Sequence, residues 1–128
     1  GLEEIFLSKW ELLVDFNVSG IMYLKRALQL NTEIVRSSEL RISEDDKNKR
    51  NLSICKELDG DIYLSGDGGG RQYNMEKMFR DENLEVKYTN FEHPIYNQLW
   101  GGFEYGLSAI DLLFNHGPEA KDFLIGEP

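Results

Sequence analysis

A glycine-rich segment is the first place where this sequence could bind a ligand. The run SGDGGG at residues 65–70 follows an apolar stretch, residues 62–64, that is typical of a buried strand. Glycines there let backbone N–H groups approach a ligand, and the start of the following helix favours an anion. The run matches neither the dinucleotide-binding fingerprint nor the P-loop, so a plain turn is the alternative. The residues that would bind a phosphate or carboxylate here are Ser65, Gly66, Gly69, Gly70, Arg71 and Tyr73.

An arginine and two serines form a second candidate group. Arg36, Ser37 and Ser38 come at the carboxyl end of a short β-branched segment, residues 33–37, which predicts a strand. In a parallel sheet this end lies on the same edge as Ser65, and an arginine with two hydroxyls suits a phosphate or carboxylate. The alternative is a surface ion pair with Glu39 beside a hydroxyl turn.

A histidine follows the third predicted strand, again at its carboxyl end. His93, with Glu92 beside it, could act as a general base or orient a substrate, although a hydrogen-bonded loop histidine is the alternative. Aromatic and amide side chains just beyond could wall a pocket or plug the core. These side chains are Tyr96, Gln98, Trp100 and Phe103.

The last apolar helix carries polar residues on one face. Ser108, Asp111 and Asn115 share that face, as a helix cap with an end residue or as a buried polar ridge. A metal site would need Asp111 and His93 to converge with Glu92 and His116, and no pair has zinc-ligand spacing. We therefore expect no metal ion and no cofactor.

Between these groups, hydrophobic periodicity predicts alternating helices and strands. Residue 17 would cap a second helix within the first thirty residues, and the box Ser43–Asp46 would begin the next one, which Gly60 ends. Cys55 on its inner stripe is predicted to be a core thiol rather than a nucleophile. The full order is two helices, strand 33–37, helix, strand 62–64, helix 74–82, strand 84–89, irregular residues 90–106, helix 108–115 and a restart after Gly117-Pro118.

Strands separated by helices predict right-handed crossovers and a parallel sheet. The expected fold class is α/β: a small, mainly parallel sheet flanked by helices, Rossmann-like with three layers, and part of a larger sheet. Residues 1–128 are predicted to form a single domain.

The overall composition limits the function further. The chain has 41% hydrophobic residues and a net charge of −9, so we expect a globular protein that binds neither nucleic acid nor a membrane. The lone Cys55 cannot close an intrachain disulfide, which fits a reducing compartment. With no membrane-spanning run and no signal peptide pattern, the predicted location is cytoplasmic.

Four segments together resemble the WbqC-like protein family. They are VRSSEL at 35–40, ICKELDGDIYLSG at 54–66, FEHPIYNQLW at 91–100 and LSAIDLLFNHGPEA at 107–120. The chain departs from the family pattern at Asp67, at one extra glycine before Arg71, at Asn97 and at His116. The family's N-terminal motif, a Gln-Pro and aromatic-rich opening, has no counterpart here, so the chain is expected to be a C-terminal portion of a longer protein. Positions with like residues in the family are Arg36, Ser37, Ser38, Ser65, Gly66, Tyr73, His93, Pro94, Tyr96, Gln98, Ser108, Asp111 and Asn115.

The resemblance implies a bacterial, cytoplasmic protein of surface-polysaccharide (O-antigen) assembly. It would be a transferase, of acyl, aminoacyl (glycine) or glycosyl type, that acts on an amino sugar or nucleotide sugar. His93 and Asp111 are then the predicted catalytic residues, and Tyr96 and Gln98 would position the substrate. The partner would be a small-molecule substrate, with a homodimer or pairing with the missing N-terminal half as a further expectation. The alternative hypothesis is a non-catalytic module that binds a ligand or a protein.

Overall fold

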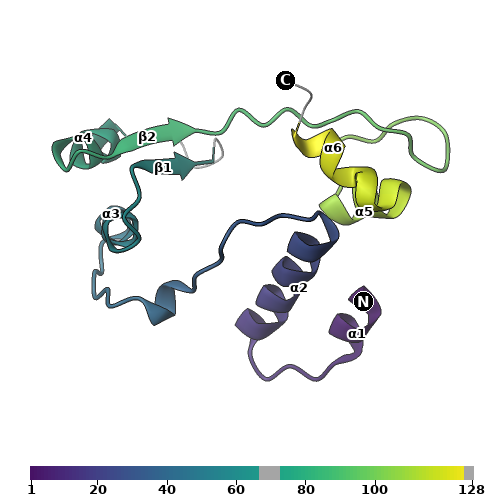
Figure 1. Cartoon of the computed structure of the whole chain (residues 1–128), viewed down its shortest axis with the longest axis horizontal. Coiled ribbons are helices and arrows are strands. Elements are labelled where there is room, and N and C mark those ends of the chain that lie inside the picture. The colour runs from purple at the N-terminus through teal and green to yellow at the C-terminus, as the bar shows by residue number, and fades with distance from the viewer. Residues whose placement is uncertain (67–72, 126–128) are drawn as a thin grey trace. The chain divides into compact units, whose positions relative to one another are not determined.

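The residues of the chain pack as two compact units. The computed structural model describes residues 1–66 and 73–125 (Figure 1). Residues 1–32 and 93–128 form one unit, here the terminal unit, and residues 33–92 form the other, the central unit. Each described part has its own hydrophobic cluster. The expectation of a single domain over residues 1–128 stays a prediction.

The central unit contains a parallel strand–helix–strand crossover. Strand β1 (Ile62–Ser65) pairs in parallel with β2 (Glu85–Tyr88), and Ser65 faces Tyr88 in the register. Helix α4 (Tyr73–Asp81) connects them and buries Phe79 completely. The pairing confirms the predicted parallel sheet and the α/β class, with two strands among the described residues. The Rossmann-like three-layer arrangement stays a prediction.

The predicted strand at residues 33–37 is wrong. The backbone there is extended at Arg36, but it pairs with no strand, and Ser37–Glu39 form the short 3-10 helix η1. A β-branched sequence favours an extended backbone, whereas a strand also needs a neighbour for its N–H and C=O groups. In the described part of the chain β1 and β2 pair only with each other. Residues 33–37 are therefore a connection rather than a third strand.

Helix α3 (Lys47–Glu57) begins three residues later than a helix capped by Ser43 would, and it ends one residue earlier than the sequence suggested. Asp46 is itself the N-cap, because its carboxylate accepts the N–H groups of Asn48 and Lys49 at 3.0 and 2.9 Å. At the other end Asp59, with φ of 50°, takes the left-handed conformation, and the Gly60 N–H donates to the Cys55 carbonyl at 2.8 Å. Gly60 closes this turn but does not provide its left-handed residue.

Cys55 lies on the inner side of α3. Its half-buried side chain packs against the cluster of buried residues around Leu52 and Phe79. Burial raises the pKa of the Cys55 thiol, which disfavours the reactive thiolate. These observations agree with the predicted core thiol.

The terminal unit is helical. Its elements are α1 (Leu2–Leu7), α2 (Leu13–Ala27), α5 (Ala109–His116), the 3-10 helix η3 (Gly117–Glu119) and α6 (Ala120–Ile125). Its buried core joins Leu28, Tyr96, Leu112, Leu113 and Ala120.

The boundary between the first two helices differs from the prediction. The Ser8 hydroxyl donates to the Glu4 carbonyl at 2.6 Å, and the Trp10 indole donates to the Ile5 carbonyl at 2.7 Å. The Glu4 carbonyl also accepts the Ser8 N–H at 3.0 Å, so it is the Trp10 indole that takes a carbonyl, that of Ile5, which a further helical turn would use. Helix α2 then begins at Leu13, so Asn17 lies inside it and does not cap it.

Helix α5 begins and ends as predicted. The Ser108 hydroxyl accepts the Ile110 N–H at 3.3 Å, and Gly117, with φ of 56°, ends the helix before Pro118 restarts the chain. The helix is not buried all round, however, because Phe114 is 68% exposed.

Across the described residues, no helix combines the length and the apolar character that a membrane crossing needs.

Candidate functional site

Two side chains of the 93–104 segment meet one carboxylate of α5. The Tyr96 hydroxyl donates to Asp111 Oδ2 at 2.8 Å, and Gln98 Nε2 donates to the same oxygen at 3.2 Å. Tyr96 is buried, with 5% of its surface exposed, whereas Gln98 and Asp111 are half-buried. Asp111 therefore links two sequence positions predicted to act on a substrate.

The same carboxylate does not complete a capping box with Ser108. Its hydrogen bonds to described residues run to Tyr96 and Gln98, while the Asp111 carbonyl accepts the Asn115 side-chain amide at 2.8 Å. Of the two interpretations of this helix face, the polar ridge accounts for Asp111 and Asn115, and the cap accounts for Ser108.

Gln98 also closes a loop. Its Oε1 accepts the Glu104 N–H at 2.9 Å, and its Nε2 donates to the Glu104 carbonyl at 3.2 Å, so the side chain bonds to Glu104 as a neighbouring strand would. Within the closed loop, Gly101 and Gly102 both have φ of 70°, a conformation that favours glycine. The loop holds Trp100 with 95% of its surface exposed.

His93 stands in a wall of aromatic rings. Its ring is stacked on Tyr96 at a centroid distance of 6.3 Å and lies 6.2 Å from Phe103 and 6.1 Å from Tyr105. His93 Nδ1 is 3.2 Å from the Pro94 carbonyl, a hydrogen bond when Nδ1 carries the proton. In that tautomer Nε2 is the nitrogen that can accept a proton from a substrate.

The tyrosine between His93 and Asp111 is held in its neutral form. Burial and the hydrogen bond to Asp111 raise the pKa of Tyr96, although the Gln98 amide lowers it somewhat. A phenol is already protonated at neutral pH, and the raised pKa of Tyr96 extends that state to higher pH. Tyr96 therefore acts here as a hydrogen-bond donor and ring platform, which makes it a positioning residue.

In the central unit, the structure places the other described site residues in different elements. Ser37 and Ser38 line a cavity of about 380 Å³, and Ser65 ends β1, where its carbonyl accepts the Thr89 N–H at 2.8 Å. Gly66 follows directly, while Gly69, Gly70, Arg71 and the side chain of Tyr73 lie outside the described residues. Because residues 33–37 form no strand, the argument that brought Arg36 to the edge of the sheet no longer holds.

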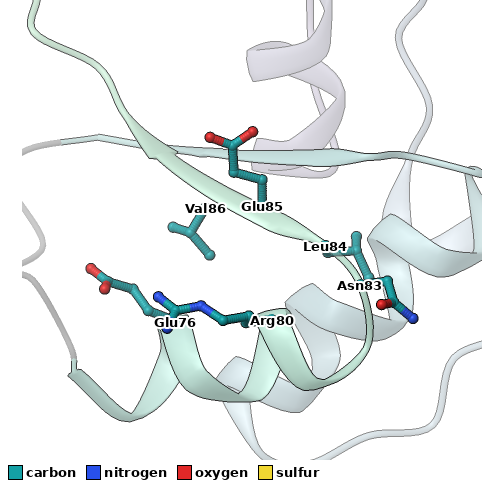
Figure 2. Close-up of a pocket in the computed structure, with 6 residues that line it drawn as sticks. All are labelled: Glu76, Arg80, Asn83, Leu84, Glu85 and Val86. Carbon is teal, nitrogen blue, oxygen red and sulfur yellow. The ribbon is translucent and has the colours of Figure 1, made fainter.

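A larger cavity, about 490 Å³, lies between α4 and β2 (Figure 2). Glu76 and Arg80 reach into it from the helix, and the Glu85 side chain points to the other side of the strand. Glu76 also accepts a hydrogen bond from the Tyr88 hydroxyl at 3.0 Å. Among the residues that the structure describes, the lining of this cavity contains no predicted site residue and no histidine, serine or cysteine.

Comparison with known proteins decides the family. The pattern of the WbqC-like protein family matches residues 1–123. The chain belongs to the WbqC-like family. The match covers nearly the whole chain, so the expectation that the chain corresponds only to the C-terminal portion of the family pattern is wrong.

One relative is "Uncharacterized protein Rv1507c" of Mycobacterium tuberculosis, which is 35% identical over 98 residues. The aligned region is 76% of this chain and 42% of the relative, so the chain spans less than half of that protein's length. No solved structure matches the chain.

For this WbqC-like chain, the structure brings together four of the predicted site residues, His93, Tyr96, Gln98 and Asp111, within the terminal unit. Their convergence with Ser65 and Gly66, which belong to the central unit, stays a prediction. Sequence reasoning missed the Gln98–Glu104 bonds and the place of Tyr105 beside His93. Two adjacent glycines between aromatic residues were the available signal for such a closed loop.

Proposed function

We propose that this chain carries the acceptor site of a transferase-type enzyme that acts on an amino sugar or nucleotide sugar in bacterial surface-polysaccharide (O-antigen) assembly. The observation that supports it most is the His93 ring set among Tyr96, Phe103 and Tyr105, with Tyr96 bonded to Asp111. Sites for small polar molecules combine aromatic walls with a few fixed polar groups, and this group has both.

In the proposed reaction His93 is the general base. Its Nε2 accepts the proton of the attacking hydroxyl or amine while that atom forms a bond to the transferred group. The bond between this group and the donor's leaving group breaks, and the leaving group takes the proton from His93. Acid–base catalysis of this kind contributes roughly a hundred- to ten-thousandfold to a rate.

Asp111 has a supporting part in this proposal. Its Oδ2 already accepts bonds from Tyr96 and Gln98, so it fixes the ring platform under His93. Among the described residues, no side chain is bonded to the second oxygen, Oδ1, which suits it to accept a hydrogen bond from a sugar hydroxyl. The compartment we propose is the cytoplasm, because a single cysteine fits a reducing environment.

A binding module is the second candidate, and the loop closed by Gln98 favours it. Leu99 and Trp100 are strongly exposed there, and exposed apolar side chains on a rigid loop suit contact with a partner protein. A homodimer, or pairing with a further N-terminal part of the protein, stays a prediction under this hypothesis.

Incubating the protein with nucleotide sugars and amino-sugar acceptors, and detecting products by mass spectrometry, tests the proposal. The expected result is a new transferred product that His93→Gln reduces at least a hundredfold, while the thermal shift caused by the substrate is retained. His116→Gln is the matched variant for loss of an imidazole: the His116 ring packs edge-on against Tyr96 at 5.7 Å, and its Nε2 lies 3.2 Å from the Asn97 carbonyl. An equal loss of product in both variants would point to packing around Tyr96 and would contradict the role of His93 as general base. If no substrate shifts the melting temperature and no product forms, the binding-module hypothesis is favoured.

A further inference from the structure

A polar cavity in the central unit has no assigned role. It has a volume of about 380 Å³ and lies between η1 and the start of α3. Three exposed serines, Ser37, Ser38 and Ser43, are among the residues that line it. Hydrogen bonds from these hydroxyls to other described residues are absent, so they are available to a ligand.

Arg50 of α3 gives this cavity its positive charge. Its Nε donates to the Glu44 carbonyl at 2.8 Å, which holds the planar guanidinium beside the cavity. Within residues 1–66 and 73–125 no carboxylate forms an ion pair with it. The remaining N–H groups of the guanidinium can therefore bind two oxygens of one anionic group, a geometry that favours phosphate or carboxylate.

Acidic side chains line the same cavity. Glu44 and Asp45 are among its lining residues, and two carboxylates disfavour a bare anion through charge repulsion. They are good acceptors for hydroxyl groups, however. Ile42 and Ile54 add apolar surface on which the carbon skeleton of a sugar ring can pack.

We propose that this cavity binds a sugar phosphate. The phosphate lies on Arg50, the sugar hydroxyls bond to the serines and to Glu44 and Asp45, and the ring packs on the isoleucines. A neutral sugar would leave Arg50 unused, and inorganic phosphate would leave the carboxylates without partners. The inference rests on the proposed function for the choice of a sugar phosphate, whereas the site itself is built from the central unit alone.

Isothermal titration calorimetry of the full chain tests the site. The probes are glucose 1-phosphate, glucose and inorganic phosphate. We expect glucose 1-phosphate to bind at least tenfold more tightly than glucose or inorganic phosphate. It alone among the three carries both a phosphate for Arg50 and hydroxyl groups for the carboxylates of Glu44 and Asp45. Equal affinity for inorganic phosphate would overturn the proposal in favour of a simple anion site, and absence of binding by glucose 1-phosphate would overturn it altogether.

Variants identify the residues. Arg50→Gln should weaken glucose 1-phosphate binding roughly ten- to hundredfold. Arg50→Lys should recover part of the affinity, because lysine keeps the positive charge but lacks the paired N–H donors of the guanidinium. Lys49→Gln is the matched control: it removes the same charge from the neighbouring position on α3, outside the cavity lining, and should change the affinity less than twofold.

A second variant covers the possibility that Arg50→Gln loosens the backbone at Glu44. Ser38→Ala leaves Arg50 in place and should weaken binding about three- to tenfold through one lost hydroxyl bond. Unchanged affinity in both Arg50→Gln and Ser38→Ala would refute the site. Because these titrations use no turnover, binding through Arg50 together with an unaffected His93→Gln reaction would refute the proposed function and leave the site standing.

Discussion

Replacing Tyr96 by phenylalanine removes a single hydroxyl from the contact between the 93–104 segment and α5. The hydroxyl lies 2.8 Å from Asp111 Oδ2, and the ring it belongs to is buried. The ring contacts with Phe103, His116 and Phe123 do not need the hydroxyl and should persist. The variant therefore tests the hydrogen bond with little change in packing.

The expected loss in the free energy of unfolding follows from the type of hydrogen bond that is removed. A hydrogen bond to a charged group contributes about 1.5–3 kcal/mol to folding, more than a neutral one. Gln98 still donates to Asp111 Oδ2 in the variant, so the carboxylate keeps one partner and the loss should lie toward the lower end of that range. We expect the free energy of unfolding to fall by about 1.5–2 kcal/mol.

Urea unfolding, followed by tryptophan fluorescence, measures this change. Both tryptophans, Trp10 and Trp100, belong to the terminal unit, and Trp10 is packed against Phe16 and hydrogen-bonded to a carbonyl, so its emission reports on that unit. Tyr105→Phe is the control, because this ring is exposed and should change the free energy of unfolding by less than about 0.5 kcal/mol.

A double-mutant cycle sharpens the test. With Asp111→Ala already present, the Tyr96 hydroxyl has lost its acceptor, so adding Tyr96→Phe should cost no more than about 0.5 kcal/mol. If Tyr96→Phe costs the same with and without Asp111, or if it matches the Tyr105→Phe control, the bond does not fix the segment to α5. The positioning role assigned to Tyr96 and Asp111 would then be wrong.

Three further predictions concern single contacts. Gln98→Ala should open the 99–103 loop, and hydrogen exchange at the Glu104 amide should accelerate at least fivefold because its acceptor is gone. The raised pKa of Tyr96 keeps its phenol protonated to higher pH in the folded chain than in the unfolded chain. The stabilisation from this difference is complete below about pH 10 and is lost as the pH rises through the folded pKa. Urea midpoints measured up to pH 11 should therefore fall less in Tyr96→Phe than in the unmodified chain. Asp46→Ala should lower the unfolding free energy of the central unit by about 1 kcal/mol, measured by circular dichroism, because the Asn48 and Lys49 amides lose their cap, whereas Asp45→Ala should not.

Patterns within a few residues predicted much of the secondary structure. The strand at 62–65, the helix with Met75 and Phe79 inward and the strand at 85–88 follow from local alternation and helical spacing. The parallel pairing follows from the order of these elements, since a helix between two strands carries the chain back to the same end of the sheet.

The wrong secondary-structure predictions concern segments whose conformation depends on a contact with another part of the chain. Residues 33–37 have the composition of a strand and form none, because no neighbour among the described strands pairs with them. Helix α1 ends early because the Trp10 indole bonds to the Ile5 carbonyl, a competition that apolar spacing does not reveal.

The sequence by itself named the polar candidates and placed Ser108, Asp111 and Asn115 at the start of or within the last helix, because helix caps, turns and hydrophobic periods act over a few residues. His93, Tyr96, Gln98 and Asp111 could all be named in this way. Only the tertiary structure decided that Asp111 bonds to Tyr96 and Gln98 and does not reach back to the start of its own helix. A carboxylate bonds the donor that packing brings within about 3 Å, and segments 13 or more residues apart meet only after the chain has folded.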